Sequence, residues 1–241
     1  MNIDRYLELE RTHFWRIGKR RLIASVLSGL LSTGEPRDII DIGGAESLLI
    51  PVLSRFGYIM RADPVSPNAD MCDSLPNLLS IHMQYDLVTL FDVLEHVEQD
   101  VASLRTIYSK LRPGGRLMMT VPAYQWLYSG HDKALGHHRR YTSRNLRKML
   151  EAAGFHVERI TYWTTLLFPL MVAQRLASKW IGRNDGTYHV SIPPRFINWL
   201  FGKIMDVERW LLRRVNMPFG GCILVVARKK SPARAGDERT I

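Results

Sequence analysis

The sequence predicts an α/β fold built around a mostly parallel β-sheet. Short apolar runs, several ending in glycine or a carboxylate, alternate with segments of helical periodicity from residue 38 to residue 227. Parallel strands need crossover helices of this kind, and these helices cover both faces of the sheet. With 241 residues, 46% of them hydrophobic and 23% charged, the chain can bury one sizeable core. We therefore expect one domain with additions at its edges.

The first half of the chain predicts a helical segment followed by a β-α-β unit. Apolar residues at helical spacing over 4–31 indicate two helices, interrupted around His13-Phe14-Trp15-Arg16. Residues 38–42 then predict a strand, 47–56 a helix stopped by Gly57, and 58–63 a second strand. The proline-containing segment 64–84 predicts a loop with at most a helical turn.

The second half continues the alternation. Strands are expected at 86–91, 116–121, 157–162 and 221–227, and helices at 98–111, 145–153, 166–180 and 196–215. Thr142 is a suitable N-cap for the helix at 145–153. The last helix carries apolar residues on one face, namely Phe196, Leu200, Ile204, Val207, Leu211 and Val215.

These elements divide the chain into three parts. Residues 1–34 are expected to form an N-terminal helical cap, and 35–230 the main domain, in which 165–217 is a helical insertion before the last strand. Residues 231–241 are polar and are expected to be a disordered tail.

Charge and cysteine content limit the partners and the compartment. Lys+Arg 33 minus Asp+Glu 23 gives a net charge of +10, which favours a membrane surface, a phosphorylated substrate or nucleic acid, unless it is only a solvated basic surface. Cys72 and Cys222 cannot form a disulfide framework, which fits a reducing compartment. The N-terminal residues show no secretory signal. The expected location is the cytoplasm, with a peripheral contact at the inner face of the membrane as an addition.

A turn after the first strand suggests a cofactor site. Asp41-Ile42-Gly43-Gly44 ends that strand, where backbone N–H groups can face a ligand. Asp63 ends the second strand, where a carboxylate can bind both hydroxyls of a ribose. Together they indicate an adenosine-containing cofactor, although an ordinary strand-to-helix turn is the alternative.

Three later stretches carry a family resemblance. The chain runs through Tyr85-Asp86-Leu87-Val88, then Phe91-Asp92-Val93-Leu94-Glu95-His96-Val97, then Leu111-Arg112-Pro113-Gly114-Gly115-Arg116-Leu117. This combination resembles the class I S-adenosylmethionine-dependent methyltransferases, from roughly Ile39 to Thr161. The resemblance implies a Rossmann-like sheet of seven strands whose last strand is antiparallel, with S-adenosyl-L-methionine as the cofactor.

The resemblance also implies which residues hold the cofactor. Asp41, Gly43, Gly44 and Ala45 would flank its methionine part, and Asp63 would bind its ribose. An acidic residue, Asp73 or Asp70, would meet the adenine. Three residues stand at the cofactor-facing end of the next strand, namely Asp92, Glu95 and His96. Two departures concern the glycine turn, where Ala45 and Ser47 replace glycines, and the segment from Asp63 to Asp86, which is shorter than in the family.

The stretch from Ser129 to Tyr141 supplies candidates for the chemistry. It resembles the His-Asp-x-x-x-Gly-His-x-Arg-Arg-Tyr pattern of a methyltransferase subgroup linked to glycan or lipid-linked sugar pathways. His131 or His137 is the candidate base, with Tyr141 beside them, and Arg139 or Arg140 would hold an anionic group of the acceptor. No metal is expected, because no cysteine accompanies these histidines.

The N-terminal cluster resembles the same subgroup. His13, Trp15 and Arg16 would fold over the acceptor as a lid, although core packing is an equal alternative for Trp15. The aromatic and basic helices after residue 162 would either cap the acceptor site or contact anionic lipid. Nucleic acid is not favoured, since no recognition motif or stacking platform is visible, and the sequence leaves the oligomeric state open.

Three functions remain in competition. The first is methyl transfer from S-adenosylmethionine to a small-molecule or lipid-linked acceptor. The second is a cofactor-free scaffold or a peripheral membrane-binding protein. A nicotinamide-dependent oxidoreductase ranks third, because the turn lacks the three spaced glycines and places Glu46 beside the expected phosphate.

Overall fold

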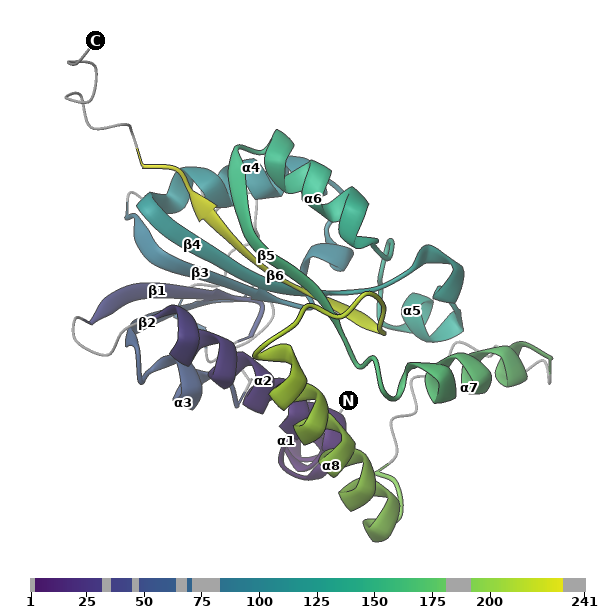
Figure 1. Ribbon diagram of the computed structural model, residues 1–241. Coiled ribbons are helices and arrows are strands. Elements are labelled where there is room, and N and C mark those ends of the chain that lie inside the picture. Colours follow the sequence, from purple (N-terminus) through teal and green to yellow (C-terminus); the bar gives the residue numbers. More distant parts are fainter. Residues whose placement is uncertain are drawn as a thin grey trace, which may run out of the picture.

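A six-stranded sheet forms the centre of the molecule (Figure 1). The structure, a computed structural model, describes residues 3–31, 36–44, 48–63, 69–70, 83–180 and 192–231. The sheet order is β2-β1-β3-β4-β6-β5. The strands are β1 Arg37–Ile42, β2 Gly57–Ala62, β3 Tyr85–Phe91, β4 Leu111–Pro122, β5 Phe155–Trp163 and β6 Cys222–Lys229. β1, β2, β3 and β4 pair in parallel, and β6 lies antiparallel between β4 and β5. The predicted α/β fold, with its antiparallel last strand, is confirmed.

Helices cover both faces of the sheet. They are α1 Ile3–Thr12, α2 Phe14–Leu30, α3 Ile50–Leu53, α4 Asp100–Lys110, α5 Gly130–Ala134, α6 Ser143–Ala152, α7 Phe168–Trp180 and α8 Arg195–Leu212, with short 3-10 helices η2 Leu94–His96 and η3 Gln125–Leu127. Figure 1 shows α4 and α6 on one face, α2, α3 and α8 on the other, and α7 extending from the edge.

The last strand, β6, shows why helices pack on both faces of the sheet. Leu224 and Val226 pack with α2 and α8, whereas Ile223 and Val225 pack with α4 and α6, and all four are fully buried. Side chains alternate between faces along a strand, so a strand buried on both sides is a continuous apolar run. The sequence Ile223-Leu224-Val225-Val226 is such a run.

The expected N-terminal helices are present, and α2 packs directly on the sheet. Ile23 and Leu27 are fully buried against Ile39 and Leu87. His13 separates the two helices, and its Nδ1 accepts a hydrogen bond of 3.2 Å from the backbone of Trp15. Thr142 caps α6 as predicted, accepting from the backbone N–H of Asn145.

Two elements differ in length from the prediction. The helix expected at 47–56 is only the four residues of α3, because Pro51 lies in its first turn and the chain turns again before Gly57. The described residues form six strands rather than the seven that the resemblance implied. The segment where another strand would fall, 64–82, lies mostly outside the described residues.

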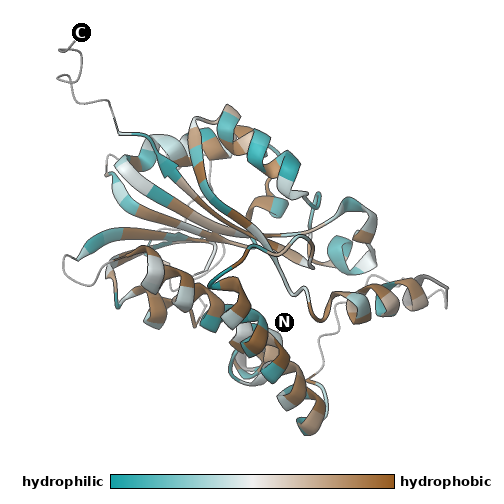
Figure 2. Ribbon diagram, viewed as in Figure 1, coloured by the Kyte–Doolittle hydropathy of each residue, from teal (hydrophilic) through white to brown (hydrophobic). Residues whose placement is uncertain are grey.

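The apolar face predicted for the last helix is mostly exposed. Phe196 is 70%, Val207 53% and Val215 51% exposed, whereas Met205 and Leu212, on the opposite side of α8, are buried against α2. Figure 2 shows the resulting apolar character along α8. Among the described residues, no helix has the length and hydropathy needed to span a membrane.

Candidate cofactor and acceptor cavity

A cavity of about 690 Å³ opens at the carboxyl ends of β1, β3 and β4, beneath α2, α7 and α8. Ligands of open α/β sheets bind at this edge. Twelve residues singled out from the sequence line it, namely His13, Trp15, Arg16, Asp41, Gly43, Gly44, Asp92, Glu95, His96, His131, His137 and Arg140. They come from four separate parts of the chain, so the fold unites the predicted cofactor, acceptor and loop residues around one space.

The glycines of the first turn are required by close contacts. Gly43 has a φ of +77°, and a Cβ there would lie 2.4 Å from Cγ2 of Val93. A Cβ on Gly44 would lie 2.4 Å from Oδ2 of Asp41. Side chains at either position would fill the space between the turn and the end of β3. Glycine at both positions therefore lets the turn pack closely on Val93 and Asp41 while it lines the cavity.

Asp41 presents an unsatisfied carboxyl oxygen at this turn. The residue is 1% exposed, and the Thr89 hydroxyl donates to Oδ1 at 2.5 Å. No described residue donates a hydrogen bond to Oδ2. Burial raises the pKa of Asp41 to about 6, although the Thr89 hydrogen bond and the charge of Lys19 oppose this rise. A buried, unpartnered oxygen fits the ammonium and sulfonium cations of S-adenosylmethionine.

The end of β3 carries an ion pair that links it to α2. Nζ of Lys19 lies 2.6 Å from Oδ2 of Asp92, and Thr120 donates to Oδ1 of Asp92 at 2.8 Å. Burial alone would raise the pKa of Asp92, but Lys19 and Thr120 outweigh it and hold the pKa below its ordinary value. Asp92 also adopts a φ of 56°, unusual for a residue other than glycine. The Lys19 contact was not predicted, because 73 residues separate the partners in sequence.

The histidine loop is fixed by the buried carboxylate of Asp132. Arg140 reaches Oδ1 of Asp132 at 2.7 Å, Arg175 of α7 reaches Oδ2 at 3.0 Å, and Nδ1 of His137 lies 3.1 Å from Oδ1. Burial would raise the pKa of Asp132, but its hydrogen bonds to His137 and Arg140 hold the pKa far below its ordinary value. Asp132 and Ser129 also form a capping box at the start of α5. Asp132 therefore sets the position of His137 and ties α7 to the loop.

Three side chains of the cavity wall have a donor set that suits a metal ion. One ligand atom from each of Glu95, His96 and His137 lies within 4.8 Å of the others. Glu95 is fully buried, and neither of its carboxylate oxygens accepts a hydrogen bond from another described residue. Burial, followed by the nearby Asp92, raises the pKa of Glu95 well above its ordinary value. No metal was expected from the sequence, because no cysteine accompanies the loop histidines. His137 is 41 positions from His96, and only the fold brings the two together.

The other histidines of the cavity are held in the neutral form. Burial, followed by the charge of Arg175, lowers the pKa of His131 to about 4. Burial and Arg16 lower the pKa of His13. His131 is therefore unprotonated at physiological pH, as a proton acceptor must be, but a pKa near 4 makes it a weak base.

Several predicted site residues lie outside the cavity. The hydroxyl of Tyr141 lies 3.3 Å from both the Leu94 carbonyl and Asp100, and burial raises its pKa, so it braces the loop. Arg139 turns away to Asp100, at 3.0 Å. Asp63 follows β2 close enough to Asp41 to raise that residue's pKa, but it does not line the cavity.

Of the two adenine candidates, Asp73 lies outside the described residues, as does Ala45, which was expected beside the methionine part. Asp70 is described and binds Arg61 through both carboxylate oxygens, at 2.8 and 2.9 Å. Its carboxylate is therefore already engaged within the chain.

The cavity also has an apolar wall, mostly from the helices after residue 162, which were expected from the sequence either to cap the acceptor site or to contact lipid. It is made by Phe14 of α2, Leu170 and Met171 of α7, Phe201 of α8 and Leu167. Trp15 stacks on the buried Trp163 at 5.3 Å between ring centroids, so it both packs in the core and faces the cavity. The aromatic content of these helices was a signal, but only the fold shows which of their side chains turn inward.

These features define a Rossmann-like domain with a cofactor turn, a charged wall and an apolar wall around one cavity. A family model described as a methyltransferase domain matches residues 14–160. The chain therefore belongs to the methyltransferase-domain family, of the class I type that uses S-adenosylmethionine, as the resemblance implied.

Individual relatives are more distant. The ubiquinone biosynthesis O-methyltransferase of Aeromonas salmonicida is 36% identical over 88 residues, which cover 31% of this chain and 37% of that protein. A protein of Mycolicibacterium smegmatis named "Probable S-adenosylmethionine-dependent methyltransferase" is 33% identical over 75 residues, covering 30% and 29% respectively. The matches thus span about a third of the length of these relatives.

Solved structures agree on the fold. The N-methyltransferase NodS of Bradyrhizobium japonicum, in complex with S-adenosyl-L-homocysteine, superposes with a TM-score of 0.53 at 14% identity, covering 92% of this chain and 90% of NodS. At this identity the likeness shows the shared architecture alone.

Proposed function

We propose that the protein transfers the methyl group of S-adenosylmethionine to a small or lipid-linked acceptor through an oxygen or nitrogen atom. The observation that carries the proposal is the single cavity that joins the glycine turn at Asp41 to the apolar wall of α7 and α8. The cofactor would be held by Asp41, Gly43 and Gly44, with Asp63 near its ribose. When bound, it supplies an electrophilic methyl group on a positively charged sulfur.

The residues of the chain would mainly align the acceptor. Methyl transfer is an in-line displacement, so orientation of the acceptor atom provides much of the rate. His131 is neutral and faces the cavity, which suits removal of a proton from an acceptor hydroxyl or ammonium. Arg16 and Arg140 line the same space, and each is already paired with a carboxylate, Arg16 with Glu10 at 2.8 Å and Arg140 with Asp132 at 2.7 Å. An anionic group of the acceptor would share these guanidinium groups with their partners.

The exposed side of α8 supports a lipid-linked acceptor. Phe196, Trp199, Val207 and Trp210 are 52–70% exposed and recur at helical spacing along one stripe. Lys203 and Arg214 lie on the same side, and the Arg214 guanidinium stacks 4.5 Å above the Trp210 ring. A helix with this pattern favours the surface of an anionic membrane.

Acidic groups on α8 do not oppose such a contact. Asp206 pairs with Arg21 at 2.8 Å, and Glu208 is 2% exposed and accepts hydrogen bonds from the backbone of Thr165 and Leu166. A peripheral position at the inner membrane face, with the acceptor entering beside α7 and α8, is therefore part of the proposal.

Cofactor binding is tested first, by calorimetry with S-adenosylhomocysteine. We expect one site, with the affinity lowered in Asp63→Ala. A protein that melts cooperatively but gives neither heat nor a thermal shift would favour the scaffold role instead. Transfer is then tested with S-adenosylmethionine labelled in its methyl group and a bacterial lipid extract. Label that enters the organic phase supports a lipid-linked acceptor, and label that enters only the aqueous fraction supports a small molecule.

Membrane contact needs a separate measurement. The protein is sedimented with vesicles of phosphatidylcholine containing phosphatidylglycerol. Replacing Trp199 and Trp210 by serine should reduce the bound fraction at least threefold. Tyr58→Ser, at a 72% exposed position on β2, should leave it unchanged. Equal binding by all three proteins would exclude the α8 stripe.

A further inference from the structure

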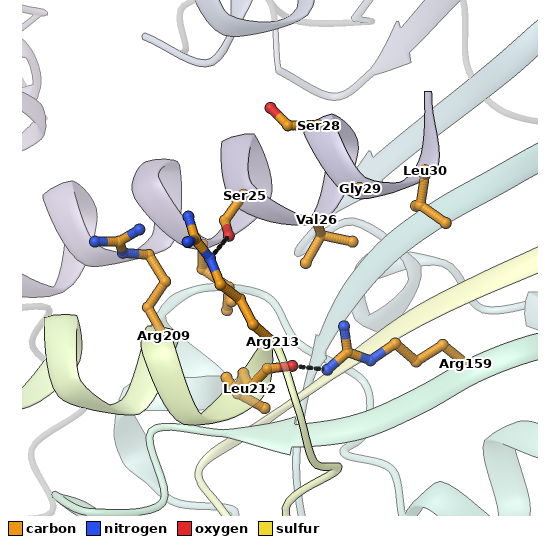
Figure 3. A pocket seen from close by; sticks show the side chains of 10 residues that line it. Ser25, Val26, Ser28, Gly29, Leu30, Arg159, Arg209, Leu212 and Arg213 are labelled. Atoms are coloured by element: carbon orange, nitrogen blue, oxygen red, sulfur yellow. Dashed lines mark hydrogen bonds between the residues drawn. The ribbon is translucent and has the colours of Figure 1, made fainter. Parts of the chain in front are cut away.

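A second cavity lies between α2 and α8, away from the cofactor turn. It has a volume of about 470 Å³ and is lined by the C-terminal half of α2, the end of α8 and Arg159 of β5. Figure 3 shows three arginines around this space, Arg159, Arg209 and Arg213. None of the described residues that line it is acidic.

Two of the three guanidinium groups lack a carboxylate partner among the described residues, and the third has only a long contact with one. Within the described part of the chain, neither Arg159 nor Arg213 forms an ion pair. Arg159 donates to Asn216 and to the Leu212 carbonyl, and Arg213 donates to the Ser25 hydroxyl at 3.0 Å. Arg209 meets Asp206 only at 3.5 Å. Like charges gathered without counter-charge repel one another, and an anion relieves this repulsion.

One donor of the cluster is buried and unused. Nε of Arg209 is shielded from solvent and has no hydrogen-bond partner among the described residues. A buried N–H without a partner costs about 1–3 kcal/mol, and such groups commonly mark a missing ion or water. Burial also lowers the pKa of Arg159, as expected where no anion compensates its charge.

We propose that this cavity binds a phosphate-bearing ligand through Arg159, Arg209 and Arg213. Planar guanidinium groups match the oxygens of a phosphate, and the Ser25 hydroxyl lies beside them. The opposite wall is apolar, made by Leu22, Val26 and Leu30 of α2. The site therefore suits a phosphate with an apolar portion attached, and both a lipid headgroup and a soluble phosphate ester have this chemistry. The inference is independent of the methyl-transfer proposal.

The test uses the full chain and two probes, inorganic phosphate and the soluble short-chain lipid dihexanoyl phosphatidylglycerol. Affinity is measured by calorimetry, and thermal midpoints are compared with chloride at equal ionic strength. We expect Arg213→Gln to weaken binding at least tenfold and Arg209→Gln with Arg213→Gln to abolish it. Arg147→Gln is the control, because this exposed arginine of α6 pairs with Glu151, at 3.7 Å, and does not line the cavity.

Each outcome has a defined meaning. If the lipid binds at least tenfold more tightly than phosphate, the source is a headgroup, and if both bind equally, it is a soluble phosphate. The proposal is overturned if neither probe binds at millimolar concentration. It is also overturned if Arg213→Gln binds like the unmodified protein, or if Arg147→Gln loses as much affinity as Arg213→Gln. Thermal melts without ligand identify any variant that fails to fold. If the double variant does not fold, the affinities of the single variants decide whether the proposal holds.

Discussion

Lys19 of α2 and Asp92 at the end of β3 form an ion pair of 2.6 Å at the wall of the cofactor cavity. The Lys19 side chain is 8% exposed and that of Asp92 is 27% exposed, so the pair is largely shielded. Removing one partner of such a pair leaves the other charge uncompensated. The resulting loss of folding stability is larger than the stability that the intact pair contributes.

Lys19→Met should therefore destabilise the protein by about 2–3 kcal/mol, less than the loss of about 3–5 kcal/mol for a fully buried pair, because Asp92 is partly exposed. Adding Asp92→Asn should recover most of the loss, since asparagine is neutral and tolerates a positive φ. Urea unfolding of both variants measures the difference. If the double variant is no more stable than Lys19→Met, charge compensation is not the role of Lys19.

The geometry of the glycine turn predicts that adding a side chain at Gly43 destabilises the protein. Gly43→Ala places a Cβ at positive φ and against Val93, so it should cost about 2–4 kcal/mol from backbone strain and overpacking. Affinity for S-adenosylhomocysteine should also fall. Gly29→Ala in α2 is the control, because its Cβ meets nothing within 4 Å. This change should stabilise the protein by up to about 1 kcal/mol. Equal melting temperatures for the two variants would contradict the turn geometry.

The raised pKa of Asp41 predicts that the stability of the protein depends on pH. Its pKa is raised to about 6 in the folded protein. Between the ordinary pKa and this value, the folded state binds more protons than the unfolded state, so stability falls as pH rises through this window. Relative to Asp41→Asn, the unmodified protein should lose about 2–3 kcal/mol between pH 4 and pH 7.

Urea unfolding of both proteins at several pH values tests this. The difference between their unfolding free energies should change up to about pH 6 and be constant above it. A difference that does not depend on pH would mean that Asp41 titrates normally in the folded protein.

Among the polar residues of the loop, Asp132 should cause the largest loss of stability when it is replaced. Asp132→Asn removes the charge that compensates Arg140 and Arg175, and we expect a loss of about 3–5 kcal/mol. The depressed pKa of Asp132 means that its contribution is complete above the ordinary pKa and is lost as the pH falls below it. Asp70→Asn, which breaks an exposed pair with Arg61, should change stability by less than about 1 kcal/mol. Thermal melts at neutral pH compare the two, and a similar loss in both would contradict the assigned role.

Replacing His131 should lower the turnover rate and leave cofactor binding unchanged. His131→Gln should lower kcat by about 100-fold or more if the imidazole takes the acceptor proton. Affinity for S-adenosylhomocysteine should be unchanged. The pH profile of the unmodified protein should show the ionisation near pH 4 and no further ionisation of this group above it. His138→Gln, at the exposed neighbouring histidine, is the control. An unaltered rate in His131→Gln would remove His131 from the chemistry.

The sequence by itself determined the order of strands and helices, the glycine turn and the residues around Asp92. Each depends on local patterns, such as the apolar run of β6 that must be buried on both faces, or the Thr142 cap of α6. The family resemblance rested on the same local segments.

Only the tertiary structure decided which side chains meet in the cavity. Lys19 and Asp92, Arg175 and Asp132, and Glu95 and His137 are each more than 40 residues apart, so no spacing rule connects them. Tyr141 and Arg139 belong to the same motif as His137, yet they turn to Asp100 because that carboxylate is their nearest partner in the fold. The burial of α8 was also decided by the tertiary structure. Sequence periodicity predicted an apolar face for this helix, but the helix packs on α2 through its other side, so much of the predicted face is exposed. Local sequence fixes backbone conformation, whereas the direction of a polar side chain depends on the charges that folding places beside it.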